Sequence, residues 1–599
     1  KEGSFYTPAY ITMYMCKETL RRAVVQKFKE IENEEIETFE DLVFHCTRVK
    51  KLDDIKRLNT VFNSLKVCDP AVGSGHFLVS ALNELILIKH ELGLLVDITG
   101  GSLAKYNFNI ENDELYVTDE EGHLIDYKPN NKESARVQHT LFHEKQTIIE
   151  NCLFGVDINP NSVKICRLRL WIELLKNAYY TKSGVFQTLP NIDINIKCGN
   201  SLISRFDLND DLQDAFNGKD VKYNFTDYKE AVKQYKQSNS KEQKGEVLEI
   251  INEVKNNFIS SLDDDTILDR QKAVGKYETE KARQDHLILF EEKITKVDKK
   301  ILKKLKIIAD EALHKESEII NNKIYDDAFE WRFEFPEVLD EVGNYIGFDV
   351  VIGNPPYVQL SKIKSTSIEE KKYLLNKFGI SGGRLNTYIF FIHQSKNISN
   401  NNGFVSYIIP NTILTQDYYK ETRRLLLKDI KLYEIGYFDS LPFADAVVET
   451  IIISYSKVKK IDSIDFVEFS KTNYKFDKSV FLSKFISDES YRISYTLDEL
   501  TESIFKKESV LNLNQLAEIN QGIALKGDKT LSIKNSNDNN NYYKVLDGRN
   551  INKYSINWVD TYLDYSLDRI HSCKTKTIFQ TKEKLFFRRV SANLIFTYD

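Results

Sequence analysis

The chain has 599 residues, too many for one hydrophobic core, so roughly two to four domains are expected. Its hydrophobic share of 42%, its mean hydropathy of −0.40 and the lack of an apolar run near the ~20 residues of a membrane helix predict a soluble globular protein. The formal net charge of −6 excludes a protein that is basic throughout, although a local positive face is enough to bind nucleic acid.

The seven cysteines form no CxxC pair and lie mostly in apolar runs. An odd, scattered set of cysteines favours reduced, buried thiols over disulfides or a zinc site. We therefore expect a cytoplasmic protein without a metal site. Because the chain starts at Lys1 rather than Met and stops in the strand-like "LIFTYD", we also expect a fragment of a longer protein.

The first predicted elements are a helical segment and a strand–loop–helix unit. Apolar spacing in "AYITMYMCKETLRRAVVQKF" predicts helices within residues 1–60. A short strand at Leu65–Cys68 then runs into the glycine loop "DPAVGSGHF" (69–77) and a further helix, an arrangement that opens many nucleotide-binding α/β domains. Residues 98–131 are polar and rich in turn residues, which indicates an inserted hairpin.

Two more strands and a charged region follow. Cys152–Val156 reads as a second strand, and "NIDINIKC" (191–198) alternates as a third. Residues 205–325 are dominated by Lys, Glu and Gln at helical spacing, which predicts a helical insertion, such as an antiparallel hairpin. Its charges are explained most simply as solvated faces, with DNA contact as the alternative.

From Phe348 the strand–helix alternation resumes, with strands expected near 350, at 403–410, at 433–438 and at 449–456. About seven strands alternating with helices predict a doubly wound, mostly parallel α/β sheet. The last two strands have a short connection and should pair antiparallel. After about residue 500, short strands with Gly and Asn turns predict a separate β-rich module.

The glycine loop at 69–77 offers backbone amides that a ligand can approach closely, because Gly73 and Gly75 carry no side chain. The Gly-Lys-Ser/Thr of a phosphate loop is absent, and so is the third glycine of a dinucleotide loop. Asp69 just before the loop favours a ligand with an ammonium or sulfonium group over a nucleoside triphosphate. A plain strand–helix turn is the alternative.

Polar side chains also end the second and third strands. Asp157 stands where doubly wound domains bind ribose hydroxyls, although a helix-capping role before Asn159 explains it equally. Asn200, in "KCGNSL", could hydrogen-bond an adenine edge or serve as a turn residue.

The fourth strand ends in "GNPPY" (353–357), in which two prolines stop a buried run. The Asn354 amide oxygen and the Pro355 carbonyl can together accept both hydrogens of an exocyclic amine. Tyr357 offers a flat face for the ring that carries that amine. This arrangement favours methyl transfer to an aromatic NH2 group, and a simple strand-ending turn is the alternative.

The motifs "GSFYTP", "DPAVGSGHF", "FGVDINP", "CGNSL", "FDVVIGNPPY" and "GFVSYIIP", followed by a β module, occur in this order. Together they resemble the gamma-class N6-adenine DNA methyltransferases. The similarity is greatest to the TaqI-type enzymes and to the methyltransferase–specificity part of type IIG restriction–modification proteins. "RLRLWIELL", "FEWRFEFPEVL" and "YYKVLDGRNI" are similar to the same group, and the resemblance covers nearly the whole chain.

The resemblance implies S-adenosylmethionine as the cofactor. The implied contacts are Tyr6, Thr7 and Pro8 at the methionine end, Asp69, Ala71, Gly73 and Gly75 along the methionine and ribose, Asp157 at the ribose hydroxyls and Asn200 at the adenine. The family often has Asp where this chain has Asn200.

The resemblance also implies double-stranded DNA as the partner and a flipped adenine as the substrate. The implied catalytic set is Asn354, Pro355, Pro356 and Tyr357, with Tyr357 stacking on the extruded base and Phe443 on its opposite face. No metal is needed for this transfer.

The implied domain organisation has four parts. Residues 1–60 complete the cofactor site, 61–204 and 326–470 form the methyltransferase domain, 205–325 are the helical insertion, and 500–599 are an incomplete target-recognition domain. Candidate DNA contacts in the last part are Arg549, Lys553, Arg588 and Arg589.

Alternative functions remain at this level. Protein-glutamine and ribosomal-RNA methyltransferases use a similar Asn-Pro-Pro-Tyr site. A restriction endonuclease could use this part mainly to bind DNA, but no Asp…Glu-x-Lys set stands in a strand context, so a nuclease domain or subunit would lie outside these residues. A restriction–modification system and a BREX-like phage-exclusion system fit the sequence equally.

Overall fold

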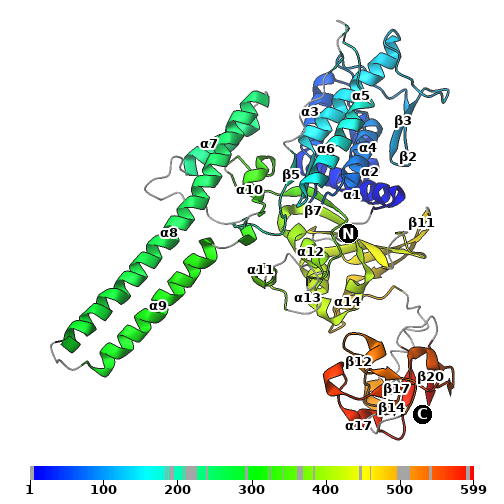
Figure 1. The fold of residues 1–599 in the computed structure, drawn as a ribbon. Helices are drawn as coiled ribbons and strands as arrows, with labels where there is room; N and C mark the ends of the chain where they lie inside the picture. The colour runs from blue at the N-terminus through cyan, green and yellow to red at the C-terminus, as the bar shows by residue number, and fades with distance from the viewer. Residues whose placement is uncertain are drawn as a thin grey trace. The chain divides into compact units, whose positions relative to one another are not determined.

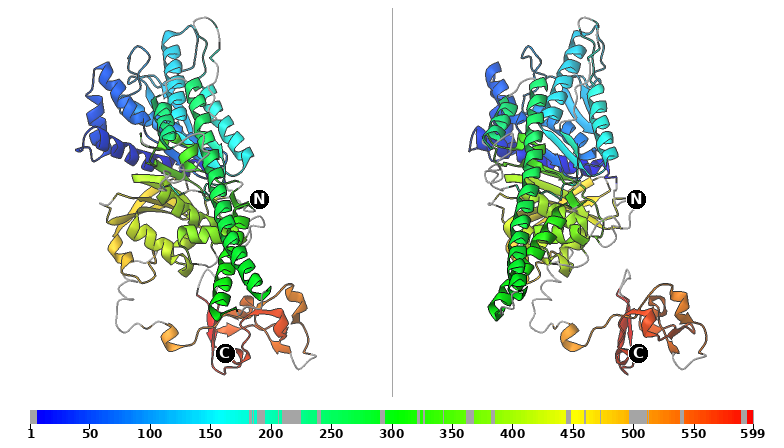
Figure 2. Two further views of the ribbon diagram at one scale, coloured as in Figure 1. Left: turned by 90° about the vertical axis from the view of Figure 1, so that its left-hand side faces the viewer. Right: turned by 60° about the vertical axis from the view of Figure 1, so that its left-hand side comes forward.

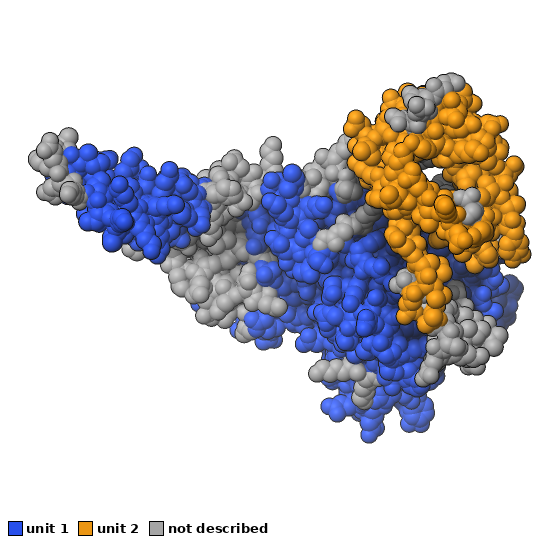
Figure 3. All heavy atoms as spheres, turned by 90° about the horizontal axis from the view of Figure 1, so that it is seen from below, with its two compact units in different colours: residues 1–495 blue, residues 496–599 orange. Residues whose placement is uncertain are grey.

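The computed structural model divides the chain into two compact units, residues 1–495 and residues 496–599 (Figure 3). The structure describes residues 6–181, 184, 186–187, 195–205, 207–208, 225–237, 241–289, 294–320, 323–325, 327–341, 343–360, 368–381, 385–443, 448–458, 461–471, 473–495, 511, 513–537, 542–588 and 594–598.

The first unit is built on one sheet of nine strands among the described residues, in the order β11-β10-β8-β9-β7-β6-β1-β4-β5 (Figure 1). The strands are β1 (Val67–Asp69), β4 (Leu153–Asp157), β5 (Ile196–Cys198), β6 (Phe348–Gly353), β7 (Ser399–Pro410), β8 (Lys431–Phe438), β9 (Thr450–Ser456), β10 (Ser463–Ser470) and β11 (Asn473–Phe481). Strands β5, β4, β1, β6 and β7 pair in parallel, whereas β9 pairs antiparallel to both β7 and β8.

The sheet separates two hydrophobic cores because neighbouring residues of its strands face opposite sides. Val67 of β1 and Val350 of β6 belong to one core, and Cys68 and Val351 belong to the other. The first core includes residues of α1 (Ala9–Ile31), α2 (Phe39–Thr47), α3 (Leu52–Asn63), α4 (His76–Glu91), α5 (Lys132–Asn151) and α6 (Pro160–Leu175). The second includes residues of α10 (Trp331–Glu334), α11 (Ile368–Phe378), α12 (Thr387–Ile398) and α14 (Leu482–Ile486), and of the π-helical turn Leu425–Asp429 that follows α13 (Lys420–Arg424).

All seven expected strands are present, but the expectation of a seven-stranded sheet is wrong because β10 and β11 extend it. Strand β10 joins β8 in parallel, and β11 pairs antiparallel with β10 at the sheet edge. The side chains of β11 are mostly exposed and include Lys475 and Lys478, which is how an edge strand is protected against further pairing. Its polar sequence therefore lacks the apolar run that marks the inner strands.

Two insertions interrupt this unit. The hairpin expected within 98–131 is present as β2 (Asn107–Glu111) and β3 (Glu114–Thr118), which pair antiparallel. The charged region contains α7 (Phe225–Gln237), α8 (Lys241–Leu289) and α9 (Lys296–Ile320), and both views of Figure 2 show α8 and α9 side by side. Residues 191–194 of the expected third strand lie outside the described residues.

The second unit contains short strands joined in small sheets. They are β12 (Ala524–Leu525), β13 (Ile533–Lys534), β14 (Tyr542–Lys544), β15 (Ile551–Asn552), β16 (Ser555–Ile556), β17 (Tyr562–Asp564), β18 (Ile570–Ser572), β19 (Leu585–Phe587) and β20 (Phe596–Tyr598), with the short helices α16 (Leu513–Leu516) and α17 (Lys576–Phe579). Ile551, Leu563 and Ile570 are its buried aliphatic residues among those described.

Candidate active site

The candidate site lies at the carboxyl ends of β1, β4 and β6. In open α/β sheets, ligands bind outside these ends where the strand order reverses, and here the order reverses between β1 and β6. Asp69 ends β1, Asp157 ends β4, and Asn354 follows β6. The sequence motifs therefore meet at one edge of the sheet.

The glycine loop is fixed between β1, β4 and α6. Gly73 and Gly75 adopt positive φ angles of 52° and 83°, which an L side chain rarely adopts, and the Val72 amide donates to the Val156 carbonyl at 2.9 Å. A Cβ atom added at Gly75 would stand 2.6 Å from the Cys166 sulfur. The loop must therefore be glycine at Gly75 for α6 to pack behind it.

Asp157 links the second strand to the glycine loop. Its Oδ2 atom accepts a hydrogen bond from the Gly73 amide at 2.9 Å, and its Oδ1 atom accepts one from the Asn159 amide at 2.8 Å. Asn159 caps α6 through its own side chain, which accepts from the Asn161 amide. Asp157 thus fixes the loop as well as the start of α6.

Asp69 lies directly beneath the end of β6. Its Oδ1 atom accepts a hydrogen bond from the Ala71 amide at 3.0 Å, and a Cβ atom added at Gly353 would stand 2.5 Å from the same oxygen. Only a glycine at the end of β6 leaves room for this carboxyl group. The contact places the Asn-Pro-Pro-Tyr segment beside the glycine loop.

Asn354 is held from the amino-terminal segment. Its Nδ2 atom donates a hydrogen bond to the Oγ1 atom of the buried Thr7 at 3.0 Å. This bond occupies the donor end of the amide. No described residue donates a hydrogen bond to the Asn354 Oδ1 atom or to the Pro355 carbonyl, so both acceptors are open.

The rest of the segment is clamped from α12. Thr387, the first residue of α12, donates its hydroxyl to the Pro356 carbonyl and exchanges backbone and side-chain hydrogen bonds with Val358. Tyr357 donates its hydroxyl to the Ile408 carbonyl at 2.8 Å, which anchors the far end of its ring. The Thr387 clamp could not be inferred from the local pattern, because Thr387 is simply the first residue of a helix.

Burial shifts the ionisation of the acids at this edge. Desolvation raises the pKa of Asp69 to about 8, opposed by the Ala71 amide and assisted by the neighbouring Asp157 charge. Desolvation also raises the pKa of Asp157, although the Asn159 and Gly73 amides oppose the rise. A buried and a partly buried carboxyl group at one edge of the sheet are suited to a ligand that carries positive charge.

A histidine that the sequence analysis did not single out lies beside the loop. The His76 ring packs edge to face with the exposed Tyr6 at 4.0 Å, and burial, with the nearby Arg169 charge, lowers its pKa to about 4. Neither ring nitrogen hydrogen-bonds to a described residue. The signal in the sequence that could have identified His76 is its position at the end of the glycine loop.

Pro8 precedes α1 and is half-buried.

Asn200 serves as a turn residue in this structure. Its Oδ1 atom accepts from the Leu202 amide at 3.1 Å, and its backbone pairs with the Asp327–Ala328 segment. The next residue, Ser201, donates its hydroxyl to the Pro70 carbonyl at 2.7 Å and so ties this turn to the glycine loop. A contact between Asn200 and a cofactor adenine remains a prediction.

The remaining candidates are the second stacking residue and the basic residues of the second unit. Phe443 is 5% exposed and belongs to the first core. In the second unit Arg549 and Lys553 are exposed, whereas Arg588 donates to the Ile551 carbonyl at 2.7 Å and to the Arg549 carbonyl. Arg589 lies outside the described residues. The proposed DNA contacts therefore stay predictions, and Arg588 has a structural partner.

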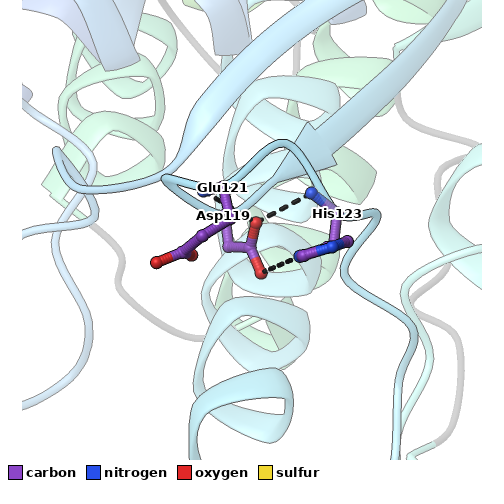
Figure 4. A group of neighbouring side chains, drawn as sticks. All are labelled: Asp119, Glu121 and His123. Carbon is purple, nitrogen blue, oxygen red and sulfur yellow. Dashed lines mark hydrogen bonds and ion pairs between the residues drawn. The ribbon is translucent and has the colours of Figure 1, made fainter.

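One group of potential metal ligands lies away from this site, in the turn after β3 (Figure 4). Asp119 accepts hydrogen bonds from the backbone amides of Glu121 and His123, and its second oxygen lies 3.4 Å from the His123 ring. The aspartate thus caps its own turn, and the other two side chains are exposed. These contacts account for the cluster.

Two family models match the chain. The "Eco57I restriction-modification methylase" model matches residues 151–443, and the "TaqI-like C-terminal specificity domain" model matches residues 543–599. The chain therefore combines a restriction-modification methylase with a TaqI-like specificity domain. The methylase match includes Asp157, Asn200 and Asn354, and the specificity domain lies within the second unit. The resemblance noted from the sequence motifs is confirmed.

Curated relatives agree with this assignment. RM.MjaORFECS2P of Methanocaldococcus jannaschii, a candidate type II restriction enzyme and methyltransferase, is 26% identical over 98% of this chain and 48% of its own length. The type II restriction enzyme and methyltransferase RM.Eco57I of Escherichia coli is 23% identical over 34% of this chain and 21% of its own. The chain thus spans at most about half the length of these relatives.

Solved structures that match part of the chain at low TM-score include a restriction–modification enzyme and a methyltransferase. The type IIL enzyme MmeI in complex with DNA is 13% identical, with a TM-score of 0.36, over 80% of this chain and 40% of that chain. A class I S-adenosylmethionine-dependent methyltransferase of Listeria monocytogenes is 13% identical, with a TM-score of 0.18, over 21% of this chain and 38% of that chain. In the part of the chain that the structure describes, no helix is long and apolar enough to cross a membrane, and all seven cysteines are free thiols.

Proposed function

We propose that this chain is the methyltransferase–specificity part of a type IIG restriction–modification protein and methylates N6 of a flipped adenine in double-stranded DNA. The observation that carries the proposal is the Asn354 amide, whose donor end is bound to Thr7, while no described residue donates a hydrogen bond to its oxygen or to the Pro355 carbonyl. Two acceptors on neighbouring residues suit the two hydrogens of an exocyclic amine. The methylase and specificity matches support DNA as the substrate.

The residues at the strand edge fit S-adenosylmethionine as cofactor. Gly73 leaves the loop backbone accessible to a ligand, since a Cβ atom added there would have only the Ala71 carbonyl at 4.0 Å as a neighbour. Asp69 is buried and Asp157 is partly buried, and a cationic ligand beside them would favour their charged forms. Tyr6, Thr7 and Ala71 would complete the methionine end, with Asn200 toward the adenine. When bound, the cofactor would supply an electrophilic sulfonium methyl group.

The residues of the chain would act mainly by positioning. Asn354 and Pro355 would accept the N6 hydrogens and so raise the electron density on that nitrogen, while Pro356 and Thr387 keep the backbone fixed. The ring of Tyr357, held by its hydroxyl bond to Ile408, would stack on the base, and such stacking contributes about 1–3 kcal/mol per base. This offsets part of the few kcal/mol needed to unstack the adenine.

The domain organisation follows from the same proposal. Residues 1–60 complete the cofactor site, residues 61–204 and 326–470 form the catalytic domain, and residues 500–599 recognise the DNA sequence. Thr7 supports the first assignment because it reaches Asn354 across 347 residues of sequence. A nuclease, if the whole protein cleaves DNA, would lie outside this chain.

The deciding experiment measures methyl incorporation from labelled S-adenosylmethionine into unmethylated DNA, followed by nucleoside analysis. N6-methyladenine is the expected product, and Asn354→Ala should slow its formation by about 10²–10³-fold while cofactor binding persists. Methylation of RNA or of a protein glutamine by the same preparation, with none of DNA, would contradict the proposal.

A further inference from the structure

The helical hairpin of α8 and α9 presents a lysine surface that the methylase site does not use. Leu302, Leu305 and Ala309 of α9 are the residues turned toward α8, with Ala309 only 3% exposed. Near the turn between the helices, Arg283 forms an ion pair with Asp298 at 2.5 Å. The two helices are therefore joined by a defined seam along one face of α9.

Between Lys296 and Lys306, the charged residues that lie away from the seam are all lysines, and the exposed Asp310 and Glu311 follow on the same side in the next turn. At 3.6 residues per turn, these lysines spread over about half of the helix surface, on the side away from the seam. They are Lys296, Lys299, Lys300, Lys303, Lys304 and Lys306, all exposed. We call these six residues the lysine face.

The charges of the lysine face are unbalanced, although the chain as a whole carries a net charge of −6. None of its six ammonium groups forms an ion pair with a described residue. Asp298 is bonded instead to Arg283 and Thr295 on the seam side. A helix face that is merely solvated usually mixes both signs and forms pairs three or four residues apart, which stabilise it. Six like charges repel each other, so the face is suited to an anionic partner.

The spacing of the lysine face matches a nucleic-acid backbone. The eleven residues from Lys296 to Lys306 rise about 15 Å along the helix. Duplex DNA presents one negative charge per roughly 1.7 Å of its axis, so every lysine of the row would find phosphates within reach. The face offers no aromatic side chain or amide that would read base edges.

We propose that the lysine face binds the phosphate backbone of duplex DNA without regard to sequence, as a second contact beside the specificity domain. The inference rests on the proposed function, because it takes DNA as the substrate of the same chain. The binding is electrostatic, releases counterions and raises affinity for DNA longer than the recognition site.

The test compares two sets of four substitutions in the full chain. One variant carries K299Q, K300Q, K303Q and K304Q on the lysine face. The control carries K51Q, K56Q, K128Q and K132Q, which remove four exposed lysines, none in an ion pair with a described residue, from another part of the same unit. Affinity for a fluorescent 40-base-pair duplex is measured between about 50 and 300 mM salt, with thermal unfolding as a check on folding.

In the lysine-face variant, the slope of log K against log salt should be less steep by about 2–4. Each lost phosphate contact reduces the steepness by roughly 0.9. Its affinity at low salt should fall at least tenfold, whereas its methyl-transfer rate at saturating DNA should stay unchanged. Equal slopes for parent and lysine-face variant would overturn the inference, and so would an equal loss in the control.

The two proposals fail in different ways. Duplex binding is measured without methyl transfer, so a parent that methylates DNA while the variant keeps its slope contradicts the inference alone. A parent that methylates only RNA or protein contradicts the proposed function, and the salt slope on duplex DNA still decides the role of the lysine face. If the salt slope is unchanged and the variant no longer binds a protein that the parent binds, the lysine face is a protein interface and the inference is wrong.

Discussion

Thr7→Val tests whether the hydrogen bond between Thr7 and Asn354 orients the catalytic amide. Valine keeps the shape of the buried threonine but removes the hydroxyl that accepts from Asn354 Nδ2 at 3.0 Å. The amide then loses the contact that distinguishes its donor end from its acceptor end. A side-chain hydrogen bond contributes about 0.5–1.5 kcal/mol, and 1.36 kcal/mol corresponds to a tenfold rate, so methyl transfer should slow roughly 2- to 12-fold.

The assay is the single-turnover rate of methyl transfer at saturating S-adenosylmethionine and DNA, which excludes effects on binding. Thr7→Ser should restore most of the rate because it restores the hydroxyl. Asn354→Ala, which removes the accepting oxygen itself, should cost about 10²–10³-fold, as for loss of one donor in an oxyanion hole.

The matched control is Thr19→Val in α1, the helix that follows Thr7. Thr19 is buried, and its hydroxyl has no hydrogen-bond partner among the described residues. This substitution should leave the rate unchanged and raise the free energy of unfolding by about 1 kcal/mol, because it removes an unsatisfied polar group. An unchanged single-turnover rate in Thr7→Val would refute the orienting role of the bond.

Four further outcomes are expected. Because the pKa of Asp69 is raised, the folded protein binds more protons than the unfolded chain between about pH 4 and pH 8, so the free energy of unfolding without cofactor should fall as pH rises through that window. In unfolding titrations at several pH values, Asp69→Asn should make this fall smaller. Gly353→Ala should displace the Asp69 carboxyl group and weaken cofactor binding in calorimetry at least tenfold, whereas Gly275→Ala in α8, with nothing within 4 Å, should raise stability by up to about 1 kcal/mol. Arg588→Gln should lower the unfolding midpoint of the second unit in a thermal scan without changing the sequence that is methylated, because its guanidinium bonds to backbone carbonyls. Deleting residues 500–599 should remove specific DNA binding in a gel-shift assay, and undiminished specific binding would place the reader elsewhere.

Much of the sheet could be predicted because strands buried on both faces are continuous apolar runs. Every residue of β6 is buried, and its sequence is apolar but for Asp349 and Gly353. Strand β11 could not be predicted in the same way. It lies at the edge of the sheet, where most of its side chains are exposed, so it has no continuous apolar run. Its pairing with β10 depends on backbone hydrogen bonds that any side chain permits.

For the candidate site, the residues could be predicted from the sequence, but their contacts could not. Asp69, Asp157 and Asn354 could be selected from sequence because each ends a strand, and parallel strands bring their carboxyl ends to one edge. What each side chain contacts there could not be inferred from local pattern. The hydrogen bond from Asn354 to Thr7 depends on how the segment before α1 crosses the sheet, and the space above Asp69 depends on the absence of a side chain at Gly353.

The family resemblance implies Phe443 as the second stacking partner of the base, and this role stays a prediction. The Phe443 ring is 5% exposed and packs in the first core. To stack on a base it would have to leave that core, at a cost of about 1.5–3 kcal/mol for exposing a large apolar side chain. Tyr357 needs no such movement, because its ring is only partly buried and its hydroxyl is already anchored. The base would therefore meet Tyr357 first, and stacking on Phe443 would require the loop after β8 to rearrange.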